Sequence, residues 1–175
     1  MKKPDISEKA VKVTYLSIGS NLGDKIINIE KAKYYISRLN LNIIQSSSLY
    51  ETASWPNKNF PKFINIVLKV KTSLNLIDLF LEIKNIELEL GRIKKPKNYP
   101  RTCDIDIIDF NGINKKIFTT KYNLIVPHPR MHKRNFVLFP LYEVNNNWVH
   151  PKNNLNITKL ISNLSLNQIR GIKIL

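Results

Sequence analysis

Two hydrophobic periodicities alternate along the first two thirds of this chain, and their order limits the folds that it can adopt. Apolar or β-branched residues at every second position are typical of strands, and apolar residues three and four apart are typical of amphipathic helices. These patterns predict strands at residues 11–18, 42–50, 63–70 and 102–110, and helices at residues 24–39 and 74–90. The predicted order is therefore strand, helix, strand, strand, helix, strand.

This order is that of a split βαβ unit, in which antiparallel strands form one sheet with both helices on one face. The sequence therefore predicts an α+β protein with a ferredoxin-like antiparallel sheet. After Phe110, the Asn111–Gly112 pair indicates a hairpin turn. Helical patterns follow at residues 130–143, interrupted by Pro140, and at residues 157–164.

The length of 175 residues predicts a single domain at residues 11–175, preceded by a mobile tail at residues 1–10. The single cysteine, Cys103, excludes an intramolecular disulfide and is expected to be a small core residue. We find neither an apolar run long enough to cross a membrane nor a secretory signal pattern. These features predict a cytoplasmic protein.

The chain carries 28 Lys and Arg against 13 Asp and Glu, which gives a formal net charge of +15. Such a charge favours an anionic partner: nucleic acid, lipid head groups or a small phosphate compound. Most lysines are scattered and are expected to lie on the solvated surface. Residues 92–101 differ, because they hold five cations, no acid and two prolines. This composition predicts a basic loop.

Asp104 and Asp106 are the strongest candidates for chemistry. Residues two apart on a strand point to the same face, so the two carboxylates should converge. Carboxylates so close repel each other unless a cation lies between them, and Mg²⁺ accepts one or two protein carboxylates together with substrate phosphates. The alternative is a solvent-facing pair on a half-exposed strand.

Arg92 and Arg101 stand at the two ends of the basic loop. A guanidinium group offers a planar set of donors that suits phosphate oxygens, so the loop could close over a polyphosphate. The alternative is a solvated loop with no ligand.

Phe63 and Asn65 share the strand face opposite the apolar one. An aromatic ring beside an amide suits a flat heteroaromatic ligand, although Asn65 could equally be a satisfied buried amide. A third cluster consists of His128, held between two prolines, with Arg130 and Arg134; it could bind phosphate or form a basic surface turn. His132 and His150 are expected at the surface.

Seven segments in a fixed order carry a resemblance to a known family. They are residues 15–24 (YLSIGSNLGD), 47–52 (SSLYET), 63–65 (FIN), 91–92 (GR), 101–107 (RTCDIDI), 126–131 (VPHPRM) and 134–141 (RNFVLFPL). In composition, order and spacing they resemble the 6-hydroxymethyl-7,8-dihydropterin pyrophosphokinase family of folate biosynthesis. The resemblance covers roughly residues 13–143.

The resemblance implies a three-layer αβα sandwich that transfers pyrophosphate from ATP to the hydroxymethyl group of 6-hydroxymethyl-7,8-dihydropterin, leaving AMP. It implies two Mg²⁺ ions held by Asp104 and Asp106, with ATP as co-substrate. It also implies a monomer that acts on small molecules, with no nucleic acid, membrane or obligate protein partner.

The resemblance assigns a role to each matching residue. The catalytic residues are Arg92, Arg101, Asp104 and Asp106. The ATP-binding residues are Glu87, Lys94, Lys95, His128 and Arg134. The pterin-binding residues are Thr52, Ala53, Trp55, Phe63, Asn65 and Phe136. The aromatic residue of the basic loop is Tyr99, where many relatives carry Trp.

A nucleic-acid-binding module without catalysis is the alternative function. A ferredoxin-like sheet with strong positive charge is typical of RNA-recognition domains. However, this sequence lacks the aromatic-rich strand motif of those domains, and Asp104 and Asp106 would repel phosphates unless a metal ion lay between them.

Overall fold

The computed structural model describes residues 10–39, 41–93, 96 and 98–175. The first half contains β1 (Lys12–Ser20), α1 (Lys25–Arg38), β2 (Asn42–Ser46), β3 (Tyr50–Thr52), β4 (Phe63–Thr72) and α2 (Leu76–Glu89). The second half contains β5 (Asp104–Phe110), β6 (Lys115–Phe118), β7 (Asn123–Val126), a 3-10 helix (Met131–Lys133), α3 (Asn135–Val144), α4 (Ile157–Ser162), α5 (Leu166–Arg170) and β8 (Ile172–Ile174). Nine of the ten residues of the predicted mobile tail lie outside the described residues.

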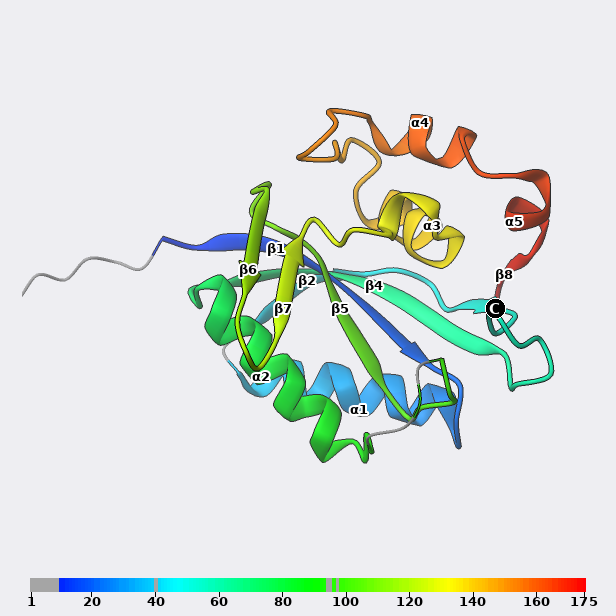
Figure 1. The fold of residues 1–175 in the computed structure, drawn as a ribbon, viewed down its shortest axis with the longest axis horizontal. Helices are drawn as coiled ribbons and strands as arrows, with labels where there is room; N and C mark the ends of the chain where they lie inside the picture. Colours follow the sequence, from blue (N-terminus) through cyan, green and yellow to red (C-terminus); the bar gives the residue numbers. More distant parts are fainter. Residues whose placement is uncertain (1–9, 40, 94–95, 97) are drawn as a thin grey trace, which may run out of the picture.

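One antiparallel sheet organises the fold, with its strands in the order β5-β1-β4-β3-β8 (Figure 1). β1 is an inner strand and pairs with β4 on one side and β5 on the other. β2 and β3 pair with different parts of β4, and β6 pairs with β7 in a second, two-stranded sheet. The predicted α+β class with an antiparallel sheet is confirmed.

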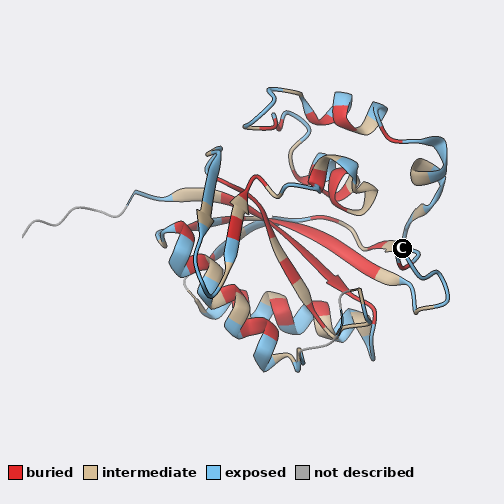
Figure 2. Ribbon diagram, viewed as in Figure 1, coloured by how far each residue is buried: buried red, intermediate tan, exposed pale blue. Residues whose placement is uncertain are grey.

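Helices cover both faces of the large sheet, so the strands between them are mostly buried (Figure 2). α1 and α2 pack on one face, around a core that includes Leu16 and Ile66. α3 and α4 pack on the other face, around a core that includes Val67 and Ile108. The alternation predicted for β4 is therefore confirmed, because Ile66 and Val67 belong to opposite cores.

Local sequence signals account for the ends of the two long helices. The Asp24 side chain accepts a hydrogen bond from the Ile27 N–H and caps α1. Gly91 follows α2 with a φ of 80°, a conformation that favours glycine. Cys103 is fully buried, and burial raises the pKa of its thiol to about 12. It is therefore a core residue, as predicted.

Several predicted elements differ from the structure. The single strand expected at residues 42–50 is two strands, because the chain turns after Ser46 and the Ser47 N–H bonds to the Val67 carbonyl. The helix expected at residues 130–143 is a 3-10 turn followed by α3, with Pro140 inside it. The helix expected at residues 157–164 ends at Ser162, before α5 and β8.

Two smaller predictions also need correction. Asn111 and Gly112 form a turn with positive φ at both positions, but the strand that follows, β6, pairs with β7. His150, expected at the surface, is buried beside Trp148. None of the helices in the described part of the chain is long and apolar enough to span a membrane.

Candidate active site

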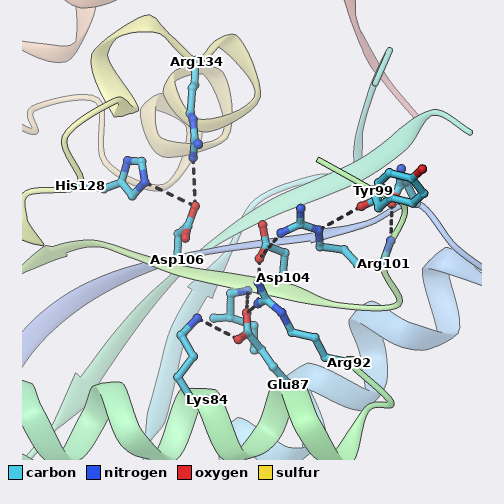
Figure 3. Close-up of polar contacts among 11 residues, drawn as sticks. Lys84, Glu87, Arg92, Tyr99, Arg101, Asp104, Asp106, His128 and Arg134 are labelled. Carbon is cyan, nitrogen blue, oxygen red and sulfur yellow. Dashed lines mark hydrogen bonds and ion pairs between the residues drawn. The ribbon is translucent and has the colours of Figure 1, made fainter. Parts of the chain in front are cut away.

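Asp104 and Asp106 lie at the start of β5, on the face of the sheet that α3 covers (Figure 3). Ile105, between them, points into the opposite core. Their side chains are 29% and 31% exposed, so both carboxylates can be reached from solvent. This placement is consistent with the prediction that the two carboxylates converge on one face of the strand.

Each carboxylate has its own set of basic partners. Oδ1 of Asp104 lies 2.9 Å from Nη1 of Arg92 and 3.0 Å from Nη1 of Arg101. Oδ2 of Asp106 lies 2.9 Å from Nη1 of Arg134 and 3.7 Å from Nε2 of His128. The structure therefore brings the basic loop and the His128–Arg134 cluster, which are separate in sequence, to one acidic pair.

The donor set fits a hard divalent cation. No described residue donates a hydrogen bond to Oδ2 of Asp104 or Oδ1 of Asp106. The described residues contain no group of three or more His, Cys, Asp and Glu side chains that would enclose a metal ion. Two carboxylates that each keep one oxygen without such a hydrogen bond suit an ion that completes its coordination with water and substrate phosphates.

Glu87 lies beneath the acidic pair and is 1% exposed. Its carboxylate accepts hydrogen bonds from the Ile105 N–H at 2.7 Å, from Lys84 at 2.8 Å and from Arg92. Burial raises the pKa of Glu87, and Lys84 and the Ile105 N–H oppose that shift. This position suits Glu87 to hold Arg92 and Lys84, because its oxygens are already occupied by donors from the protein.

The end of α2 aims Arg92 at Asp104. The Gly91 N–H bonds to the Leu88 carbonyl and the Arg92 N–H to the Glu87 carbonyl, both at 2.9 Å. These two bonds form a Schellman motif, which turns the chain sharply out of the helix. Arg92 therefore leaves α2 directly above Glu87, with its guanidinium between Glu87 and Asp104.

Asn21 fixes the other end of the basic loop. Its Oδ1 accepts from the Arg101 N–H at 2.9 Å, and its own N–H donates to the Arg101 carbonyl at 3.2 Å. Its Nδ2 donates to Ser54 and to the Pro61 carbonyl. Asn21 is buried and connects three loops. No sequence pattern assigns Asn21 a role of its own, although it lies in residues 15–24, the first of the seven segments that carry the resemblance.

His128 presents a donor to the site. Its Nδ1 accepts a hydrogen bond from the Arg130 N–H at 3.2 Å, so the neutral ring carries its proton on Nε2, which faces Asp106. Burial lowers the pKa of His128, although Asp106 opposes that shift. Burial alone would raise the pKa of Asp106, but nearby positive charge lowers it below its usual value. The groups that lower the pKa of Asp106 are His128 in its protonated form, then Arg134 and Lys84.

A buried polar pair, Thr52 and Asn65, lies beside the acidic pair on the same sheet face. Gly19 pairs with Asp104 on one side and with Asn65 on the other. A Cβ at Gly19 would lie 2.7 Å from Oδ1 of Asn65, so only glycine leaves room for that amide. Asn65 is buried and donates to Oγ1 of Thr52 at 3.2 Å.

The other predicted site residues are placed as follows. Phe63 and Thr52 face each other across β3 and β4, and the Arg134 guanidinium lies 5.4 Å from the ring centre of Phe136. Ala53 is exposed, and Trp55 is 73% exposed. Tyr99 packs against Phe60 with ring centres 5.5 Å apart. Lys94 and Lys95 lie outside the described residues.

The fold and site define an α+β protein in which arginines and paired carboxylates are assembled for a phosphate-bearing ligand. Residues 15–146 match the profile of the 7,8-dihydro-6-hydroxymethylpterin-pyrophosphokinase (HPPK) family. The chain is also 42% identical over 137 residues to the 2-amino-4-hydroxy-6-hydroxymethyldihydropteridine pyrophosphokinase of Aquifex aeolicus, covering 78% of this chain and 82% of that protein. The chain therefore belongs to the HPPK family.

Some longer proteins match this chain over only part of their own length. It is 39% identical over 158 residues to the folic acid synthesis protein fol1 of Pneumocystis carinii, covering 90% of this chain but 21% of that protein. A Plasmodium falciparum HPPK-DHPS crystal structure superposes with a TM-score of 0.77 at 16% identity, over 97% of this chain and 48% of that one. This second likeness supports the fold alone.

Proposed function

We propose that this chain transfers the pyrophosphoryl group of ATP to the hydroxymethyl oxygen of 6-hydroxymethyl-7,8-dihydropterin, giving AMP and the pterin pyrophosphate. The observation that carries the proposal is the pair Asp104 and Asp106, each with basic partners on one oxygen and with no hydrogen bond from a described residue to the other. The family membership and the polar pair Thr52 and Asn65 agree with it.

Asp104 and Asp106 would hold two Mg²⁺ ions, which when bound neutralise phosphate charge and polarise the phosphoryl group under attack. In the reaction the hydroxymethyl oxygen bonds to the β-phosphorus, the bond from that phosphorus to the bridging α,β oxygen breaks, and the hydroxyl proton is released. Arg92 and Arg101 would bind phosphate oxygens and stabilise the charge that builds on the leaving AMP. His128 would donate from Nε2 to a phosphate oxygen.

The pterin would lie next to Thr52 and Asn65, whose hydroxyl and amide groups suit the polar edge of its ring. Phe63 and Phe136 would contact the two ring faces. The roles of Ala53, Trp55, Lys94 and Lys95 stay predictions from the resemblance. A monomeric, cytoplasmic protein with no obligate partner also stays a prediction.

We further propose that residues 11–175 form a single domain with a ferredoxin-like core inside a three-layer sandwich. The strand order β5-β1-β4-β3, all antiparallel, and the placement of α1 and α2 on one face support this description. The comparisons do not support the nucleic-acid-binding alternative, since the matched family and the most similar relatives are named as pterin or folate enzymes.

The Asp106→Ala variant tests the assignment. Without this carboxylate the site loses half of its metal-binding oxygens, so turnover should fall below about a thousandth of the wild-type rate. AMP release in the presence of ATP, Mg²⁺ and the pterin is measured, with circular dichroism to check folding. Asp78→Ala, at an exposed position of α2, is the control and should keep full activity. Near-normal Mg²⁺-dependent activity of Asp106→Ala would contradict the assignment.

A further inference from the structure

The last eleven residues, Ser165–Leu175, lie beyond the part of the chain that matches the family profile. They contain α5 and β8, which run from α4 to the edge of the large sheet (Figure 1). No residue of α5 or β8 is buried, so this segment adds little to the hydrophobic cores. We call it the C-terminal strap.

At one end the strap holds the turn before α3. Nε2 of Gln168 donates to the Lys133 carbonyl at 2.9 Å, and Nδ2 of Asn135 donates to the Gln168 carbonyl at 2.6 Å. Arg134 lies between the two anchored residues and bonds to Asp106, and Phe136 follows directly. The strap therefore fixes the backbone from which Arg134 and Phe136 project.

At the other end the strap joins the sheet. β8 pairs with β3, with Ile172 opposite Thr52, and the Leu175 N–H bonds to the Leu49 carbonyl at 3.0 Å. Thr52 is the residue that accepts the hydrogen bond of the Asn65 amide. The strap therefore also fixes the strand that carries Thr52, one member of the polar pair.

Gly171 is the only residue between α5 and β8, so the two ends are closely coupled. A Cβ at Gly171 would lie 2.9 Å from the Asn167 carbonyl oxygen, which explains why the chain has glycine at this tight connection. With so short a link, a shift of α5 must be passed on to β8.

We propose that the C-terminal strap sets the spacing between the two sides of the pterin site, with Gln168 as a positioning residue. The inference rests on the proposed function, because Phe136 and Thr52 are pterin residues only under that function. The two carboxylates, Arg92 and Arg101 belong to other elements, and among the described residues none of them hydrogen-bonds to the strap. Arg134, which the resemblance assigns to ATP, is held separately by its own bond to Asp106. Loss of the strap contact should therefore weaken pterin binding more than ATP binding.

The Gln168→Glu variant removes the hydrogen bond to the Lys133 carbonyl and keeps the capping box at the start of α5. Oε1 of Gln168 accepts from the Ser165 N–H at 3.1 Å in a capping box, and glutamate can keep that bond. Glutamate cannot donate to the Lys133 carbonyl. Gln168→Met removes the same donor without adding charge, and Asn135→Asp removes the other bond while keeping the acceptor for the Phe136 N–H. Gln45→Glu, on the exposed strand β2, is the matched control.

The measurements are kcat, the KM of each substrate, the dissociation constant of the pterin with α,β-methylene-ATP present, and Tm. All three variants should raise the pterin KM and dissociation constant by about five- to tenfold, as expected for one lost hydrogen bond. The ATP KM should change less than about twofold, and Gln45→Glu should match wild type.

An unchanged pterin KM, or equal rises in both KM values, would overturn the role of the strap. Failure of the underlying function gives a different result, because the wild-type protein itself would then release no AMP.

Discussion

Asn21 and Glu87 are buried polar side chains that organise the charged residues of the site. Asn21 binds the backbone of Arg101, and Glu87 binds the side chains of Arg92 and Lys84. A buried carboxylate is costly unless donors surround it, and here three do. Asn21 therefore positions Arg101 and Glu87 positions Arg92, and both contacts are present without a bound ligand.

Replacing Glu87 by Gln should slow turnover while the protein stays folded. The amide can still accept the Ile105 N–H bond, but it removes the negative charge that holds Arg92 opposite Asp104. We expect kcat to fall about tenfold, which corresponds to about 1.4 kcal/mol of transition-state stabilisation. Glu89→Gln, exposed at the end of the same helix, is the control for steady-state kinetics. Equal kcat values for the two variants would contradict a positioning role for Glu87.

His150 should make the stability of the protein depend on pH. Burial and the neighbouring His132 lower its pKa, so the unfolded chain binds a proton at higher pH than the folded one does. The free energy of unfolding should therefore be highest above about pH 6.5 and fall as the pH drops through the folded-state pKa. Between pH 7.5 and 5, the free energy of unfolding measured by urea denaturation should fall less for His150→Asn than for the wild type. Parallel curves for variant and wild type would show that His150 does not contribute.

The sequence predicted the residues of the site whose chemistry is distinctive, and missed those whose role is positional. Asp104, Asp106 and the flanking arginines are notable because charge and spacing together suggest a ligand. Nothing in the local pattern distinguishes Lys84 from a solvated lysine, or His150 from a surface histidine. Their environments depend on packing between elements that are distant in sequence.

At the scale of elements, periodicity succeeded where one face of an element is buried. β4 and α2 have a continuous apolar face, and both were predicted close to their observed limits. β8 was not predicted, because its three residues, Ile-Lys-Ile, are too few for their alternation to indicate a strand and two of them are exposed. The break between β2 and β3 depends on bonds from Ser47 to Val67, which are tertiary contacts.

Glu143 joins α3 to the segment between β2 and β3. It accepts hydrogen bonds from the Ser48 N–H at 2.9 Å, from the Ser48 hydroxyl at 2.8 Å and from the Tyr50 hydroxyl at 2.8 Å. Glu143→Ala should lower the free energy of unfolding by about 1–2 kcal/mol, because Tyr50 is buried and loses its partner. Urea denaturation measures the effect, and Glu143→Gln, which can still accept from Ser48, should lose less. Equal stability of wild type and Glu143→Ala would contradict this link.

At the scale of the whole molecule, the net charge of +15 is a poor guide to the partner. The informative charges are the few that meet at the start of β5, where arginines from the basic loop and from the turn before α3 flank two carboxylates. A field of this sign would attract ATP in general, so under the proposed function specificity would come from the two carboxylates and from the polar pair Thr52 and Asn65.

The identity of the nucleotide product shows whether this protein transfers a pyrophosphoryl group from ATP to the pterin. Purified protein is incubated with ATP, Mg²⁺ and 6-hydroxymethyl-7,8-dihydropterin, and the products are separated and weighed by mass spectrometry. Pyrophosphoryl transfer gives AMP and a pterin that carries two phosphates, in equal amounts, and neither product should form when the pterin is omitted. ADP with a singly phosphorylated pterin, or no pterin-dependent product at all, would contradict it.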